Sequence, residues 1–239
     1  MFSLFENASS VLLGTTAAVA ITHTLLGIDH SLPFIVLGRS RQWSLGYTIV
    51  VTSLCGIGHV ASSVAIGGVG ALLGASLDSL VWVESTRGVI AATLLIGFGL
   101  AYSIWAVRNI SRNVTHSNVH AHVDGTLHGH LQSYDGDNLH IHSSSANVTP
   151  WALFIVFLVG PCEPLIPLMI VPAIAGSWTL LVAVVVTFGV LTILTMGLTV
   201  TIGYQMLNAV PQYRFTRIAD VVTGLLVAAS GAGVLFLGL

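Results

Sequence analysis

Six long apolar runs, separated by short polar segments, constrain this chain more than any other feature of its sequence. A helix needs about 20 predominantly apolar residues to cross the hydrocarbon core of a bilayer, and each run reaches that length. The runs cover residues 10–37, 44–74, 87–107, 150–175, 178–206 and 217–238. They predict an all-α integral membrane protein with six transmembrane helices.

The composition agrees with a membrane protein and excludes an ordinary soluble domain. Only 7% of the 239 residues are charged and 54% are hydrophobic, with a mean hydropathy of +0.92, whereas soluble domains carry about 25% charged residues. The net charge of −2 gives no reason to expect a nucleic-acid partner. We expect a multi-pass protein of the inner or plasma membrane, with a first helix that is retained because no signal-peptide pattern precedes it.

The positive charges are all arginines, and their positions predict the orientation. Of the seven, only Arg87 falls on one side of the predicted helices. The other six are Arg39, Arg41, Arg108, Arg112, Arg214 and Arg217. Because positive residues favour the cytoplasmic side, both termini are expected outside and the 108–149 loop in the cytoplasm.

Two segments with similar sequences suggest that the chain consists of two related halves. "GIDHSLPFIV" (27–36) in the first run and "GPCEPLIPLMIV" (160–171) in the fourth share a Gly, a polar pair, then Leu and Pro, and a bulky apolar run. Three spans per half reverse the second half, so residues 1–107 and 150–239 are predicted to form a 3+3 inverted repeat around the 108–149 loop. The Gly and Pro residues predict that helices 1 and 4 are broken.

Three ionisable side chains lie at membrane depth in the first run. His23 and His30 are seven residues apart, about two helical turns, so they share a helix face. A helix interrupted near Gly27 and Pro33 would let Asp29 converge with them. Ionisable residues are costly in a membrane and usually mark a functional site. Carboxylate and imidazole suit a divalent transition metal; a proton relay and a purely structural His–Asp pair are the alternatives.

Further candidate ligands lie in the second and fourth runs. Cys55 and His59 are spaced i,i+4 and so face the same way on a helix. Cys162 and Glu163 lie among three prolines, where non-helical backbone is tolerated only inside protein or beside water. Glu163 has no neighbouring arginine in the sequence with which to form an ordinary ion pair. We therefore expect Asp29, His30, Cys162 and Glu163 to form a central site, with His59, Cys55 and His23 lining the path.

The loop between the halves is rich in histidine. Its seven histidines are His116, His120, His122, His128, His130, His140 and His142. Six of them form His-x-His pairs, and in an extended chain the two members of such a pair share a face and can chelate one ion. The spacing does not fit a closed structural zinc site, so we expect exchangeable metal binding; a polar or pH-responsive linker is the alternative.

The motifs "HTLLGIDHSLPF", "GIGHVASS" and "GPCEPLIPLMIVPA", with a His-rich loop between the halves, resemble the UreH-like and nickel/cobalt transporter membrane proteins. These are related to the sulfite-exporter-like families and to the membrane domain of the DsbD/CcdA thiol carriers. The resemblance implies metal recognition by a His-x4-Asp-His signature in an early helix, here lengthened to His23-x5-Asp29-His30. For the thiol carriers it implies a Pro-flanked membrane cysteine in each half; Cys162 matches, but Asp29 stands at the other position.

These observations lead to three hypotheses about function. The first is a transporter of a divalent transition metal, nickel or cobalt with zinc as a further candidate, that works by alternating access and not as an enzyme. The second is a membrane thiol–disulfide carrier that uses Cys55 and Cys162. The third is an accessory subunit that does not transport. The sequence leaves the oligomeric state and any partner subunits open.

Overall fold

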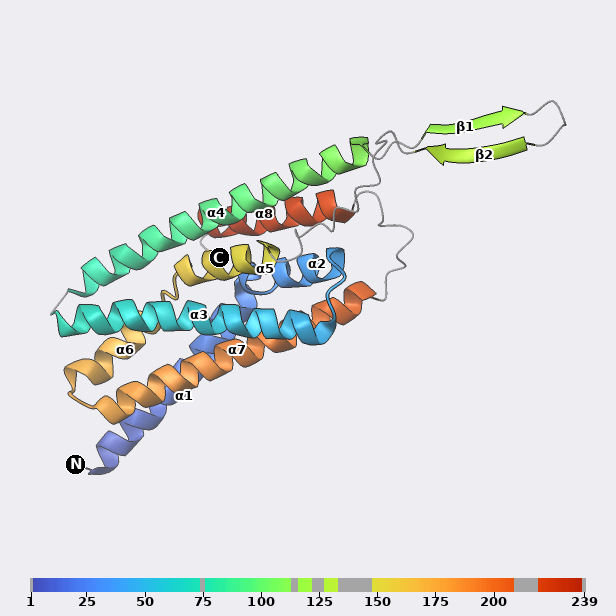
Figure 1. Cartoon of the computed structure of the whole chain (residues 1–239). Coiled ribbons are helices and arrows are strands. Elements are labelled where there is room, and N and C mark those ends of the chain that lie inside the picture. The colour runs from blue at the N-terminus through green and yellow to red at the C-terminus, as the bar shows by residue number, and fades with distance from the viewer. Residues whose placement is uncertain are drawn as a thin grey trace.

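The structure, a computed structural model, describes residues 2–73, 76–112, 116–121, 127–132, 148–208 and 219–237, and its membrane part is entirely helical (Figure 1). The helices are α1 (Phe2–Leu26), the short 3-10 helix η1 (Ile28–His30), α2 (Leu32–Ser40), α3 (Leu45–Leu72), α4 (Leu77–Arg112), α5 (Val148–Val159), α6 (Leu165–Ile174), α7 (Trp178–Asn208) and α8 (Ala219–Leu237). Two antiparallel strands, β1 (His116–Ala121) and β2 (Leu127–Gln132), follow α4.

Five helices are long and apolar enough to cross a membrane, which makes a multi-pass membrane protein the natural reading of the fold. They are α1, α3, α4, α7 and α8. The fourth predicted span, 150–175, is instead divided between α5 and α6, each of which is too short to cross alone. The helical class is therefore confirmed, and the six-span inverted repeat stays a prediction.

The first predicted span is interrupted near the middle of the molecule. The Gly27 amide donates to the carbonyl of His23 at 2.9 Å and closes the last turn of α1. The chain then forms the single turn η1, and α2 begins with Pro33 in its first turn, where the missing N–H removes no helical hydrogen bond. A side chain at Gly27 would collide with the imidazole of His30, so the break requires glycine at this position.

The fourth predicted span is interrupted in a similar way. The Gly160 amide donates to the carbonyl of Val156 at 2.9 Å and ends α5. Pro161 and Pro164 then supply no N–H groups, and Pro164 caps the start of α6. We call residues 27–31, between α1 and α2, the first break, and residues 160–164, between α5 and α6, the second break. The two lie close together, since Phe34, just after the first, and Phe157, just before the second, have ring centroids 4.8 Å apart.

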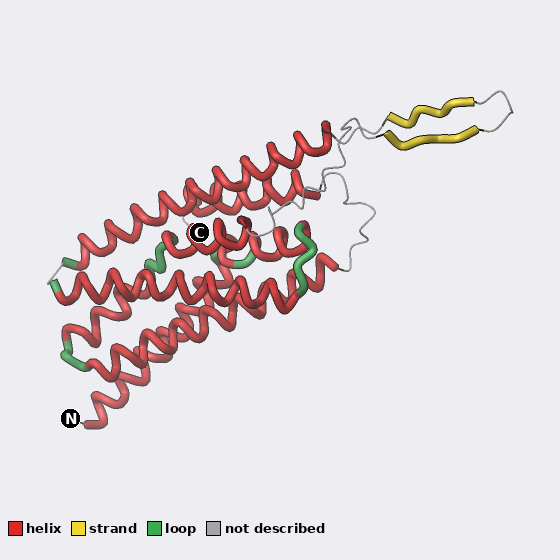
Figure 2. The backbone as a smooth tube through the Cα atoms, viewed as in Figure 1, coloured by secondary structure: helices red, strands yellow, loops and turns green. Residues whose placement is uncertain are grey.

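The helices are arranged as a bundle whose long axis is followed by α3, α4 and α7 (Figures 1 and 2). α4 packs along α8, while α7 packs along both α1 and α3. The C-terminal ends of α2 and α4 lie at one end of the bundle, and the N-terminal end of α4 and the α6–α7 connection lie at the other (Figure 1). The strands lie beyond the C-terminal end of α4, apart from the helices (Figure 2).

The surface of α7 is that of a helix facing lipid on one side and protein on the other. Its buried residues recur every four positions: Val184, Phe188, Thr192, Met196, Val200 and Tyr204. Its exposed apolar residues also recur every four positions: Val182, Val186, Val190, Leu194, Leu198 and Ile202. In a soluble protein such an exposed stripe would be a liability, whereas in a bilayer it is the expected outer surface.

α4 and α8 approach so closely that their backbones touch. A Cβ atom at Gly99 would run into the backbone of Ala228, and one at Gly231 would lie 2.8 Å from the carbonyl oxygen of Ala92. Small residues at helix contacts allow this close approach in membranes, where packing rather than water exclusion drives association. α4 and α8 therefore form the tightest helix pair among the described residues.

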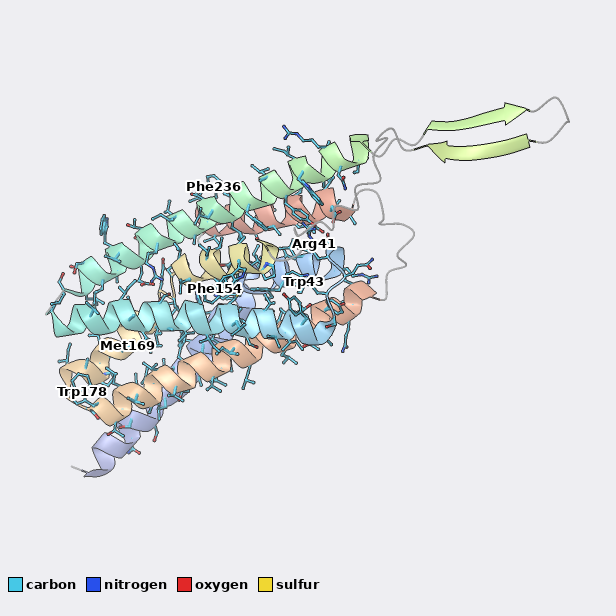
Figure 3. The ribbon with its side chains drawn as sticks, viewed as in Figure 1. Arg41, Trp43, Phe154, Met169, Trp178 and Phe236 are labelled. Atoms are coloured by element: carbon cyan, nitrogen blue, oxygen red, sulfur yellow. The ribbon has the colours of Figure 1, made fainter. Side chains whose placement is uncertain are left out.

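Polar contacts join three helices at one end of the bundle, where Figure 3 labels Arg41 and Trp43. The guanidinium of Arg41 lies 4.9 Å from the ring centre of Tyr102 and 5.0 Å from that of Trp105. Tyr102 in turn donates to the carboxylate of Asp220 at 3.0 Å. These contacts connect α2, α4 and α8 at the end of the bundle that also carries Arg39 and Arg108.

Arg87 lies further inside its helix than the third predicted run implied. The third span was expected to begin at residue 87, but α4 begins at Leu77, so Arg87 lies inside the helix with a side chain only 12% exposed. Its charge is paired with Glu84, which is 1% exposed. A hydropathy criterion places the start of the span too late, because it scores two paired charges as if each were solvated.

Candidate functional site

Three imidazoles meet where the first break lies against α3. His23 comes from the last turn of α1, His30 from η1 and His59 from the middle of α3. The ring centroids of His23 and His30 are 5.0 Å apart, and those of His30 and His59 are 5.2 Å apart. One donor atom from each of the three lies within 4.8 Å of those of the other two. His30 is therefore the middle member of a compact histidine cluster.

The Nδ1 atoms of two rings are engaged by acceptors that fix the tautomer. Nδ1 of His30 donates to the carboxylate of Asp29 at 2.9 Å, and Nδ1 of His59 faces the carbonyl oxygen of Phe157 at 3.4 Å. Carboxylate and carbonyl oxygens accept hydrogen bonds, so Nδ1 carries the hydrogen, and in the neutral ring Nε2 then keeps a free lone pair. This arrangement is typical of metal-binding histidines, whose other nitrogen is held by a carboxylate or a carbonyl.

The Nε2 atoms are the unusual feature of the cluster. Those of His23, His30 and His59 are all buried, and none has a hydrogen-bond partner among the described residues. Buried polar atoms are nearly always paired, and an unpaired group often belongs to a ligand site. Three such atoms in one place form a donor set that protein groups do not complete.

A cavity of about 300 Å³ adjoins the cluster. Of the seven residues predicted for the membrane site, five line it: His23, Asp29, His30, His59 and Glu163. The remaining walls come from the second break and from α4 and α8, among them Phe157, Gly160, Pro161, Gly88 and Leu235. The cavity thus lies between the two breaks.

The two cysteines do not line this cavity. Cys55 is 1% exposed and packs in an apolar cluster that includes Phe34 and Met196. Cys162 is fully buried in a separate cluster that includes Leu165 and Phe188. Both are free thiols. Cysteine behaves here as a small hydrophobic residue, which is its commonest role in a protein interior.

The histidines of the loop are described only in part. His116, His120, His128 and His130 belong to β1 and β2, where His120 is paired with His128 and Asn118 with His130 in the strand register. His122, His140 and His142 lie outside the described residues. The predicted chelating pairs of the loop therefore remain a prediction.

A polar network behind the second break was not anticipated. Glu84 of α4 accepts hydrogen bonds from the hydroxyl of Ser63 at 3.1 Å and from the amide of Cys162 at 3.0 Å. Arg87 donates to the carbonyl oxygens of Leu158 and Gly160, both at 3.1 Å. The i,i+3 spacing of the two charges in an apolar environment was the signal in the sequence that could have revealed them.

The chemistry available at this site is ligand exchange. Three imidazole nitrogens can hold a transition-metal ion and leave coordination positions open towards the cavity. Asp29 and Glu163 add carboxylates to the lining, and none of the lining residues is an arginine. Comparison of the chain with protein-family models, with curated proteins and with solved structures found no match.

Proposed function

We propose that this protein is a membrane transporter of a divalent transition-metal cation, which binds between His23, His30 and His59. One observation carries the proposal: three buried Nε2 atoms without protein partners converge, and two of the rings are oriented through Nδ1. Neutral imidazole is a ligand of nickel, cobalt and zinc.

The charge of the cavity supports a cation as the substrate. Its lining includes the carboxylates of Asp29 and Glu163 and no basic side chain other than the imidazoles. Arg87 lies nearby, but its charge is paired with Glu84. An anion such as sulfite would meet two carboxylates without a compensating positive charge, so the cavity disfavours it.

The donor set supports a borderline metal ion. Cysteine and methionine sulfur favour Cu(I), and neither Cys55 nor Cys162 is among the lining residues. Imidazole with nearby carboxylate suits Ni²⁺, Co²⁺ and Zn²⁺. Nickel and cobalt are the first candidates because the sequence motifs resemble transporters of these ions.

The position of the cluster supports transport rather than a structural metal site. Many transporters bind their substrate near the bilayer midplane beside interrupted helices, at the interface of inverted repeats. The order of elements here, one interrupted span followed by two continuous helices and then the same again, fits a 3+3 inverted repeat. Alternating access around a central site requires no covalent chemistry, so we propose a transporter and not an enzyme.

The His-rich segment is proposed to collect the cation for this site. Its histidines are exchangeable ligands on the side of the membrane that the arginines assign to the cytoplasm. Replacing all seven loop histidines by asparagine should raise the metal concentration needed for half-maximal transport and leave the maximal rate unchanged. If the maximal rate of transport fell as well, the loop would instead be part of the transport path.

The test is uptake of Ni²⁺, Co²⁺ and Zn²⁺ into proteoliposomes. We expect wild type to move at least one of these ions, and His30→Ala or His59→Ala to abolish the movement. Cys55→Ser, which alters a buried residue outside the cavity, should transport like wild type. A wild type that moves none of the ions would contradict the proposal. Activity in thiol exchange that depends on both Cys55 and Cys162 would favour the thiol carrier instead.

A further inference from the structure

α4 carries a largely buried ion pair, with Arg87 12% and Glu84 1% exposed, and neither residue lines the cavity beside the histidine cluster. We propose that Glu84 and Arg87 are positioning residues, which hold the second break in its observed shape and thereby keep His59 aimed at the cation. The functional part of this inference rests on the proposed metal site, whereas its structural part does not.

Arg87 takes the place of the missing helical hydrogen bonds at the end of α5. The guanidinium nitrogen Nη2 shares its two N–H groups among three acceptors: the carbonyl oxygens of Leu158 and Gly160, each at 3.1 Å, and the hydroxyl of Ser62 at 2.7 Å. The last carbonyls of a helix have no partners within the helix. At membrane depth water does not satisfy them unless a cavity brings it there. The fork of donors on an arginine can serve several carbonyls at once.

Glu84 serves the donor on the other side of the break. Its Oε2 accepts from the amide of Cys162 at 3.0 Å, and the hydroxyl of Ser63 lies within hydrogen-bond distance of both groups. Cys162 stands between Pro161 and Pro164 and supplies an N–H that α6 leaves unpaired. The pair on α4 thus binds both the acceptors and the donor of one interrupted backbone segment.

The backbone of residues 157–160, which Arg87 holds, lies directly against the imidazole of His59. The carbonyl of Phe157 faces Nδ1 of His59 at 3.4 Å, and a Cβ at Gly160 would lie 3.3 Å from the same nitrogen. A shift of residues 157–160 would therefore release the contact that orients His59. Outer-shell partners of this kind commonly change metal affinity by about 10–100-fold when they are lost.

A charged pair is an expensive way to hold two helices together. Charges at membrane depth are costly and rare, and replacing a buried ion pair by apolar residues of similar size often leaves a fold equally stable or more stable. A pair that hydrogen-bonds to the backbone on both sides of a break in the neighbouring span, and to Ser62 and Ser63 of α3, is better explained by the geometry that it specifies. This argument predicts local loosening, and not global unfolding, when the pair is neutralised.

The double variant Glu84→Gln/Arg87→Gln tests the inference, because it removes both charges and leaves neither unpaired. The protein in lipid nanodiscs is labelled with a membrane-permeant maleimide, and the two native cysteines report separately through Cys55→Ser and Cys162→Ser backgrounds. Cys162 is fully buried beside Glu84 and Arg87, whereas Cys55 is 1% exposed and lies away from this pair. The matched control is Arg108→Gln, an exposed arginine on the same helix.

We expect the double variant to expose Cys162 to the maleimide while Cys55 stays protected, and the control to protect both. Continued protection of Cys162 would overturn the inference. If both cysteines become reactive, the milder variant Ser63→Ala is labelled in the same way. Labelling of Cys162 alone supports the inference. Labelling of neither cysteine, or of both, overturns it.

Titration with Co²⁺, followed by its visible absorption spectrum, tests the functional part. The double variant should bind Co²⁺ about tenfold more weakly than wild type and with an altered spectrum, because His59 loses its fixed orientation. An unchanged affinity and spectrum would overturn the positioning role. If wild type itself binds no Co²⁺, Ni²⁺ or Zn²⁺, the metal-site proposal fails, and the labelling of Cys162 still decides whether the pair holds the break.

Discussion

At the scale of single residues, the ring of His30 divides its two nitrogens between two tasks. Nδ1 is held by the carboxylate of Asp29 at 2.9 Å, and Nε2 is left buried and without a protein partner. The carboxylate fixes both the tautomer and the ring orientation, and it raises the basicity of the other nitrogen. Asp29 therefore acts through His30, even though it also lines the cavity.

This role predicts the effect of replacing Asp29. Asp29→Ala should weaken Co²⁺ or Ni²⁺ binding by about 10–100-fold, because His30 loses the carboxylate that orients it. Asp29→Asn should have a smaller effect, since the amide oxygen can still accept from Nδ1. Calorimetric titration of the purified protein measures both. The control is Asp78→Asn, an exposed carboxylate in the first turn of α4; equal affinities for all variants would contradict the role.

At the scale of helices and their breaks, glycine decides where backbone and side chains may meet. Gly27 leaves room for the imidazole of His30, and Gly99 leaves room for the backbone of α8. The first controls the site and the second controls the fold. Substitution at the two positions should therefore produce different kinds of defect.

Gly27→Ala is expected to impair the site with little effect on stability. The added methyl group would collide with Nδ1 of His30 and displace the ring from its place between His23 and His59. We expect metal affinity to fall at least as far as in Asp29→Ala, by about tenfold or more. Gly14→Ala is the matched control, since a methyl group there meets nothing within 4 Å. Wild-type binding by Gly27→Ala would show that the break is wider than described.

Gly99→Ala is expected to destabilise the fold. Its methyl group would press on the backbone of Ala228, which cannot rotate away as a side chain can, and such overpacking costs about 1–3 kcal/mol. Gly97→Ala lies on the same helix and meets nothing within 4 Å, so the better helix propensity of alanine should leave it neutral or slightly stabilised. Thermal unfolding in detergent compares the two, and equal melting temperatures would contradict the close packing of α4 on α8.

The same scale shows how far the sequence could go in predicting the structure. Glycine and proline have local effects, so the breaks near Gly27 and Gly160 could be located from the chain alone. The i,i+4 spacing correctly places Cys55 and His59 on related faces of α3, but one turn of rise moves Cys55 out of the cavity and into the core with Met196. Whether a buried residue of α3 lines the cavity or joins the core depends on how α3 packs against α7. The spacing of residues along α3 alone does not predict this packing.

The buried ion pair between Glu84 and Arg87 is a second feature that was not predicted from the sequence. Glu84 and Arg87 each read as a penalty in a hydropathy window, although together they form a buried pair inside α4. The backbone partners of Arg87, the carbonyls of Leu158 and Gly160, and that of Glu84, the amide of Cys162, all lie more than 70 residues away. Contacts of this kind become visible only when the chain is folded.

At the scale of the whole molecule, one group of arginines and the histidine cluster lie at different levels along the bundle. One end carries Arg39 and Arg41 at the C-terminus of α2 and Arg108 near the C-terminus of α4 (Figures 1 and 3). Between His30 and Arg41 the chain forms α2, whose Phe34 and Leu37 are fully buried in an apolar cluster. A cation bound at the histidines is thus separated from the arginine-bearing end by packed side chains.

The distribution of arginine predicts the orientation in the membrane. In a protein without its native cysteines, Ser76→Cys should react with an impermeant maleimide added to intact cells, and Ser44→Cys should react only after the membrane is opened. Both positions are exposed, Ser44 between α2 and α3 and Ser76 before α4. The opposite pattern would reverse the orientation derived from the positive-inside rule and would leave the fold unchanged.

The order of the ligands along the chain bears on how the protein is synthesised. All three imidazoles lie before residue 60, whereas the carbonyl that faces His59 belongs to Phe157, 98 residues further on. A nascent chain that has been inserted as far as α3 therefore already contains every nitrogen donor of the cluster. The third ring acquires its orientation only after α5 has entered the membrane, so the timing of translation separates the appearance of the ligands from the maturation of the site.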